Sequence, residues 1–149
     1  MKNSILSFES KREHYRADVT VVWSFDDRFS LALQVLSDKK GWKAYDLIKV
    51  AGGAKDLCTE DETCGSSFLL DQISKSIRLH NSPEVYLMNH YNCGAYGRNQ
   101  MEPTEDEDRF FMNELRVAKK RVEDHLRLHD ISVPVRNLLV DFRDIYEVD

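Results

Sequence analysis

The sequence predicts an α/β fold with a mostly parallel sheet of four or five strands and helices on both faces. Short β-branched runs alternate with segments of helical apolar spacing, which is the pattern of parallel sheets with helical crossovers. Polar clusters follow these runs, at the points where parallel strands would end. A length of 149 residues suits one hydrophobic core, so we expect residues 1–149 to form a single domain.

The first half of the chain supplies two strands and two helices. Residues 19–23 read Val-Thr-Val-Val-Trp, a short apolar run typical of a buried parallel strand. After it, the spacing predicts a helix over about 29–36 that stops near Gly41, a strand over 45–50 and a helix from about 68 to 80. Ser66 or Ser67 is expected to cap that second helix, because a serine hydroxyl can accept a bond from a free N–H of the first turn.

The second half continues the alternation. It predicts a strand over 84–88, a long charged helix from about 102 to 129 and a strand over 135–142. Phe111, Leu115 and Ala118 lie on an apolar stripe of the long helix. The tail, 143–149, is expected either to form an edge strand or to fray.

Composition excludes two classes of partner. Lys plus Arg is 21 and Asp plus Glu is 26, giving a net charge of −5. Nucleic-acid binding relies on clustered cations, so we expect no nucleic-acid partner. No apolar run approaches the roughly 20 residues that span a bilayer, so we expect no membrane partner. Residues 1–18 are polar and lack the apolar core of a secretory signal, which favours a cytoplasmic location.

The chain has three cysteines, at Cys58, Cys64 and Cys93. An odd number in a chain expected in the cytoplasm indicates thiols or metal ligands in place of a disulfide framework.

Chemistry is expected at the carboxyl ends of the strands, where ligands bind in open α/β sheets. Three polar clusters fall there, at residues 24–28, 51–53 and 90–93. The first and third would meet if the strands before them are neighbours. His90 and Cys93 could supply half of a zinc site, because imidazole nitrogen and thiolate sulfur are preferred zinc ligands. The alternative is that each side chain simply packs or faces solvent.

Asp26 and Arg28 form the second candidate pair. At this spacing a turn would let the guanidinium bind the carboxylate through two bonds. Such a pair could hold a carboxylate beside a metal and control access to it. The alternative is a solvated surface pair that contributes little to stability.

Together these motifs resemble the β-class carbonic anhydrases. Residues 24–28 read Ser-Phe-Asp-Asp-Arg, where that family has Cys-x-Asp-x-Arg. Residues 90–94 read His-Tyr-Asn-Cys-Gly, similar to the family's His-x-x-Cys-Gly. Between them, residues 50–53 read Val-Ala-Gly-Gly, similar to Asn-Ala-Gly-Gly. The resemblance covers residues 18–142.

The resemblance implies a zinc enzyme, a carbonic anhydrase (a lyase), that interconverts carbon dioxide and bicarbonate. It implies that His90 and Cys93 are zinc ligands and that Asp26 and Arg28 are the catalytic pair. It also implies a homodimer or higher homo-oligomer.

Ser24 is the main departure from the family, because it stands at the first zinc-ligand position. A serine hydroxyl is a poorer zinc ligand than a thiolate, since it is harder to deprotonate. Asp26 could serve as third ligand, Ser24 could bind through its oxygen or a bridging water, or Cys58 or Cys64 could replace it. Three functions stay open: carbon dioxide hydration at an altered zinc site, a non-catalytic dimeric binding or scaffold protein without stable zinc, and a thiol- or redox-responsive metal protein.

Overall fold

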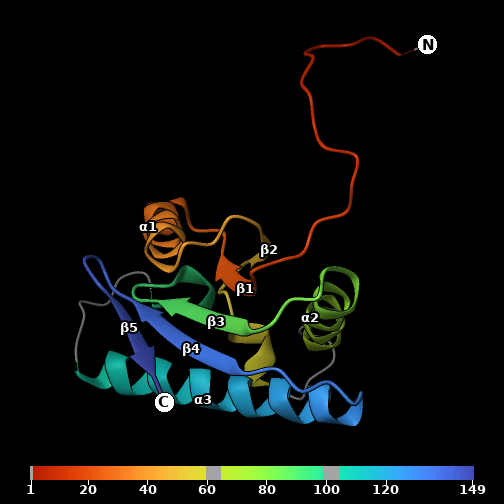
Figure 1. Cartoon of the computed structure of the whole chain (residues 1–149). Coiled ribbons are helices and arrows are strands. Elements are labelled where there is room, and N and C mark those ends of the chain that lie inside the picture. The colour runs from red at the N-terminus through yellow and green to blue at the C-terminus, as the bar shows by residue number, and fades with distance from the viewer. Residues whose placement is uncertain (1, 60–64, 99–104) are drawn as a thin grey trace.

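A five-stranded sheet with helices on both faces forms the body of the computed structural model, which describes residues 2–59, 65–98 and 105–149 (Figure 1). The strands are β1 (Val19–Ser24), β2 (Tyr45–Val50), β3 (Val85–His90), β4 (Val135–Val140) and β5 (Ile145–Val148). The longer helices are α1 (Ser30–Lys40), α2 (Ser66–His80) and α3 (Glu105–Leu128). The predicted fold class is confirmed.

The strands lie in the order β2-β1-β3-β4-β5. The first four are parallel, and β5 pairs antiparallel with β4. The chain tail therefore forms an edge strand, which was one of the two expectations for it. After β1 the chain passes to β2 on one side, and β3 then returns to pair with β1 on the other side. The strand order thus reverses at β1. Open α/β sheets bind ligands at such a point, beyond the carboxyl ends of the strands.

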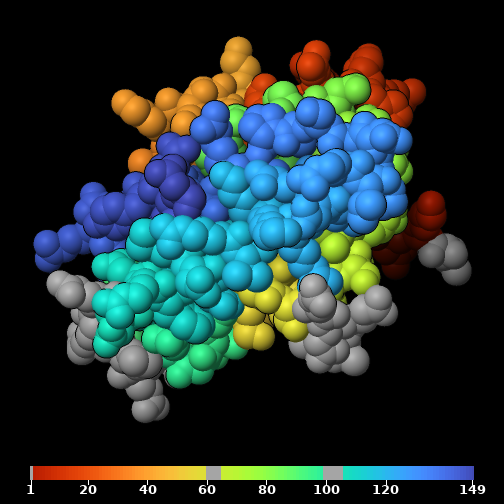
Figure 2. Space-filling model, turned by 90° about the horizontal axis from the view of Figure 1, so that it is seen from below, coloured from red at the N-terminus to blue at the C-terminus, as the bar shows by residue number. Residues whose placement is uncertain are grey.

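Two apolar layers hold the helices on the sheet. On one face, Trp23 packs with Phe29, Leu33 and other residues beneath α1. On the other face, α2 and α3 cover a larger cluster that includes Phe111 and Leu115. Figure 2 views this second face and shows α3 crossing it beside β5. Because both faces are covered, every residue of β1 and β3 is buried, as is usual for central parallel strands.

Several element ends differ from the prediction. Helix α1 ends at Lys40 and Gly41 adopts the left-handed conformation (φ +72°), which confirms the predicted stop. The predicted serine cap of α2 is wrong: Gly65 is the N-cap, it makes no side-chain capping bond, and Ser66 is buried as the first helical residue.

Strand β3 runs two residues beyond its predicted end and includes His90, whereas β4 ends at Val140, two residues early. Helix α3 is described from Glu105, and residues 102–104 of its predicted start lie outside the described residues. None of the helices in the described part of the chain is long and apolar enough to cross a membrane.

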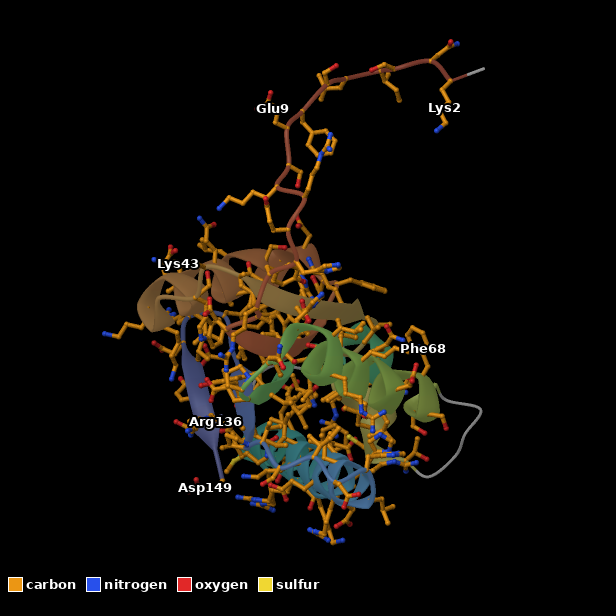
Figure 3. The ribbon with its side chains drawn as sticks, turned by 45° about the vertical axis from the view of Figure 1, so that its right-hand side comes forward. Lys2, Glu9, Lys43, Phe68, Arg136 and Asp149 are labelled. Carbon is orange, nitrogen blue, oxygen red and sulfur yellow. The ribbon has the colours of Figure 1, made fainter. Side chains whose placement is uncertain are left out.

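An extended arm, residues 2–16, projects away from the rest of the structure (Figures 1 and 3). Its root is fixed, because the Tyr15 hydroxyl donates a hydrogen bond to Asp46 and the Ala17 N–H donates to the His80 carbonyl at 2.9 Å. Further out, Ile5, Leu6 and Phe8 are 100%, 84% and 85% exposed. The arm therefore carries large apolar side chains that the described part of the chain leaves exposed.

We expect Leu115→Ala to destabilise the protein by about 2–5 kcal/mol, because Leu115 is fully buried between α3 and the sheet and its loss leaves a cavity. Leu128→Ala is the matched control, since Leu128 is on the same helix but 83% exposed. Its effect should stay within about 0.5 kcal/mol. Denaturant unfolding of both variants measures the difference, and equal losses would show that α3 does not pack as described.

Candidate functional site

The carboxyl ends of β1 and β3 form one wall of a cleft of about 540 Å³. Ser24 is the last residue of β1, His90 is the last of β3, and the two strands are direct neighbours. Asp26 and Cys93, from the loops that follow, line the same cleft. The structure thus brings together the two polar clusters that the sequence predicted to meet.

Ala51 and Gly52 line the same cleft, and the next residue, Gly53, explains how their loop fits against the sheet. Gly53 has φ +58°, and a Cβ atom placed on it would lie 2.2 Å from the Met88 carbonyl oxygen of β3. Only glycine allows this close approach. The next residue, Ala54, donates its N–H to the Asn89 side-chain oxygen at 3.0 Å and so fastens the loop to β3.

His90 and Ser24 share a buried hydrogen bond of 3.0 Å between Nε2 and Oγ. The other ring nitrogen, Nδ1, lies 2.7 Å from the Tyr91 carbonyl oxygen, which can only accept. Nδ1 therefore carries the proton, and Nε2 accepts from the Ser24 hydroxyl. Ser24 Oγ also accepts from the Asp26 N–H at 3.1 Å. Burial beneath the stacked Phe29 ring lowers the pKa of His90 to about 4, so the imidazole is neutral near pH 7.

Asp26 and Arg28 form a multiply bonded ion pair beside the cleft. Arg28 Nε donates to both Asp26 oxygens at 3.0 and 3.2 Å, and Nη2 donates to Oδ2 at 2.6 Å. These bonds from Arg28 lower the pKa of Asp26, and the same carboxylate raises the pKa of Arg28. Asp26 Oδ2 lies 3.9 Å from His90 Nε2. Asp26 is therefore held in place in the cleft wall by Arg28, which itself lines a neighbouring groove.

Two residues of this site were missed at the sequence level. Asn92 accepts two hydrogen bonds from Arg28, and its own N–H donates to the carboxylate of Glu107, on α3, at 3.0 Å. Glu107 is fully buried. Its signal was present in the sequence, because Glu107 lies four residues before Phe111 and eight before Leu115 and therefore occupies the apolar stripe of the helix.

Cys93 is buried at the start of a short 3₁₀ turn. Burial raises the pKa of its thiol, although N–H donors from Ala95 and Tyr96 oppose this effect. A protonated thiol is neither a good nucleophile nor a metal ligand. Cys93 in this arrangement is a thiol that faces the cleft.

Cys58 lies away from the cleft. Its sulfur donates to the Glu114 and Ala54 carbonyl oxygens at 3.2 and 3.4 Å, and it borders a different groove beside α3. Burial raises its pKa to about 12, which is opposite to what a redox-sensitive thiol requires. Cys64, the other cysteine considered as a replacement ligand, lies outside the described residues.

The residues of the cleft do not fit a stably held zinc ion. Zinc needs three or four nitrogen, sulfur or oxygen donors at about 2.0–2.3 Å. Across the described ranges, no three His, Cys, Asp or Glu side chains are grouped so as to hold a metal. The lone pair of His90 is taken by the Ser24 hydroxyl, and the Asp26 oxygens are taken by Arg28.

Comparison with known proteins identifies the fold. No protein-family model matches the sequence, and no curated protein sequence matches it. The β-carbonic anhydrase isoform I of the protozoan Trichomonas vaginalis matches the structure with a TM-score of 0.61 and 16% identity, over 95% of this chain and 87% of that one. The carbonic anhydrase of Glaciozyma antarctica gives 0.58 and 13%, over 91% and 84% of the two chains. The β-carbonic anhydrase CcaA gives 0.57 and 11%, over 91% and 75%.

We expect the stability of the protein to fall as the pH is lowered from about 6.5 to about 4. His90 has a folded pKa of about 4 instead of 6.5, so the unfolded chain binds a proton that the folded protein does not. This contribution is complete above pH 6.5 and is lost as the pH approaches 4, which corresponds to roughly 3 kcal/mol. Denaturant unfolding across this range measures the contribution. His90→Gln should reduce the slope of the unfolding free energy against pH.

The slope should be reduced and not abolished, because burial also lowers the pKa of His125. His14→Gln, on the exposed arm, is the control and should keep the wild-type slope. An unchanged slope in His90→Gln would show that His90 is not held neutral by burial.

Proposed function

We propose that this protein, which has the fold of the β-carbonic anhydrases, is a binding protein that holds no zinc stably. Its cleft accepts a small molecule of the carbon dioxide or bicarbonate class. The observation that carries the proposal is the 3.0 Å hydrogen bond from Ser24 Oγ to His90 Nε2, which occupies the lone pair that a metal would need. The fold and the ordered Asp26–Arg28 pair support the ligand class.

Cysteine and serine at position 24 differ in one atom, a sulfur or an oxygen. A cysteine at position 24 would offer a thiolate, which is a strong ligand for zinc. The serine hydroxyl stays protonated near neutral pH, and a hydroxyl that keeps its proton satisfies a neutral imidazole directly. The His90 imidazole is then hydrogen-bonded at both ring nitrogens without a metal ion, so no unpaired donor atom on His90 favours ion binding.

We expect purified wild-type protein to carry well under one zinc per chain, and Ser24→Cys to carry about one. The added thiolate would supply the missing strong donor beside His90 and Cys93. Elemental analysis measures the zinc content, and stopped-flow hydration of carbon dioxide should show activity gained in the variant. Titration of metal-depleted wild type with bicarbonate should shift the NMR resonances of cleft residues.

Ser4→Cys is the control, since it adds a thiol on the exposed arm and should leave the zinc content unchanged. Stoichiometric zinc in the wild type would contradict the proposal. So would a Ser24→Cys protein that gains no zinc, because position 24 would then not face His90 and Cys93. Cleft resonances that do not respond to bicarbonate would refute the ligand class.

Zinc-dependent hydration of carbon dioxide is a second candidate, favoured by one distance. Asp26 Oδ2 lies 3.9 Å from His90 Nε2, so a modest movement of the carboxylate would make it a third donor with His90 and Cys93. Zinc held in this way supplies the chemistry of the carbonic anhydrases. In that case wild-type protein carries zinc and Asp26→Asn loses it, which separates the two candidates.

We also propose that the protein is a homo-oligomer in which the arm of one copy binds a second copy. The arm exposes Ile5, Leu6 and Phe8, and exposed apolar side chains of this size gain free energy when covered. Its charged residues are four basic and two acidic, whereas the whole chain has net charge −5, so the arm and the remaining surface are complementary.

The surface that fits the arm is a groove of about 360 Å³ between α1 and the β4–β5 turn. Leu31, Val35 and Phe142 line this groove and are more than half exposed. Asp141 and Asp144 line it together with Arg28 and Arg143, so its charges are balanced and the apolar side chains carry the proposed contact.

We expect the wild type to sediment as a dimer or larger species at micromolar concentration, and Leu6→Glu or Leu31→Glu to sediment as a monomer. Each variant places a charge in the proposed contact, one on the arm and one in the groove. Leu79→Glu is the control, because Leu79 is 68% exposed on α2 and outside both surfaces. A monomeric wild type, or oligomers that survive both changes, would contradict the arm exchange.

A further inference from the structure

Asn92 holds the outer side of the Arg28 guanidinium. Arg28 Nη1 donates to Asn92 Oδ1 at 2.9 Å, and Nη2 donates to the Asn92 carbonyl oxygen at 3.1 Å. The inner side of the same group binds Asp26. A planar guanidinium bonded along two edges has little freedom to turn. Arg28 is therefore fixed between Asp26 and Asn92.

Glu107 in turn fixes Asn92. The Asn92 N–H donates to Glu107 Oε1 at 3.0 Å, and the Glu107 side chain is fully buried at the start of α3. Asn92 has φ +54°, a left-handed conformation that asparagine tolerates better than most residues. In this conformation both its carbonyl and its side-chain oxygen reach Arg28. Asn92 thus links Glu107, on α3, to Arg28 beside the cleft.

The loop around Asn92 has backbone support of its own. The Tyr91 N–H donates to the Val140 carbonyl at 2.9 Å, and the Cys93 carbonyl accepts from the Tyr96 and Arg98 N–H groups at 3.2 and 3.1 Å. The loop is therefore held on both sides of Asn92 without its carboxamide. These backbone bonds do not use the Asn92 carboxamide, whose Oδ1 accepts from Arg28.

The fixed Arg28 has a consequence for Asp26. Both Asp26 oxygens accept from Arg28, and Oδ2 remains 3.9 Å from His90 Nε2. A carboxylate ligand must bring one oxygen to about 2.0–2.2 Å from a zinc ion. Asp26 can do so only if its bonds to Arg28 rearrange.

We propose that Asn92, anchored by Glu107, is a positioning residue that holds Arg28 on Asp26 and so prevents Asp26 from completing a metal site with His90 and Cys93. This inference rests on the proposed function, because a site that holds no stable zinc is its premise. Asn92 is then a second reason, in addition to Ser24, why the site binds metal weakly, and Asn92 itself lies outside the cleft.

Asn92→Gly tests the inference in the full-length protein, because glycine accepts the positive φ and removes the whole side chain, including the Oδ1 acceptor for Arg28, while it keeps the backbone N–H and carbonyl groups. The first measurement is the rotation rate of the Arg28 guanidinium by NMR, which should increase. The second is the affinity for Co²⁺, followed by its absorption spectrum, which should rise about tenfold, the scale of such outer contacts. Adding Asp26→Asn should abolish the gain in affinity, since Asp26 is the donor that is released.

Two further variants separate positioning from a general effect on folding. Asn81→Gly is the matched control, since Asn81 has φ +53° but lies at the end of α2, and it should change neither measurement. Asn92→Asp keeps the acceptor and should retain slow rotation. It also keeps the inference testable if Asn92→Gly does not fold, because fast rotation in Asn92→Asp would overturn it.

Unchanged rotation and Co²⁺ affinity in Asn92→Gly would overturn the positioning role. A gain in affinity that survives Asp26→Asn would also overturn it, because the released donor would not be Asp26. Stoichiometric zinc in the wild type would instead refute the proposed function, and the rotation rate would still report whether Asn92 holds Arg28.

Discussion

The parallel pairing of β1 with β3 is the constraint on which the rest of the structure depends. Thr20 pairs with Val85 and Val22 with Leu87, so the two strands run side by side toward the same edge of the sheet. This pairing places Ser24 within 3.0 Å of His90, 66 residues later in the chain. The apolar layers on both faces fix the pairing, because a shift by one residue would turn every core side chain to the opposite face.

The cleft that results is electrostatically satisfied by the chain itself. The Ser24 hydroxyl donates to a neutral imidazole, and the Asp26 carboxylate is balanced by Arg28. Ser24 and His90 are buried, so the hydrogen bond between them has more weight than it would have in water. Under the proposed function, the oxygen of Ser24 in place of a sulfur at the end of β1 is what removes the need for an ion.

Much of this arrangement could be predicted from the sequence because it depends on local patterns. Apolar runs and helical spacing predicted the order of strands and helices, and the two short motifs pointed to Asp26, His90 and Cys93, which line one cleft, and to Arg28, which binds Asp26. The sequence predicted the edge strand β5 only as one of two possibilities, because the short tail shows no clear alternation of apolar and polar residues. The serine cap of α2 failed because Gly65 can adopt the left-handed entry that a serine could not easily take. Glu107 was missed although its place on the apolar stripe of the helix marked it as buried. Asn92 was missed because its role depends on contacts between α3 and a loop, which spacing within one element does not report.

Gly53 is required for steric reasons, whereas the residue at position 24 is a matter of chemistry. No side chain fits there, whatever occupies the cleft, because β3 backbone lies where its first carbon would be. Position 24 has no such steric requirement, since cysteine and serine have nearly the same shape. The backbone around the cleft is therefore set by packing alone, and it would be the same with either residue at position 24.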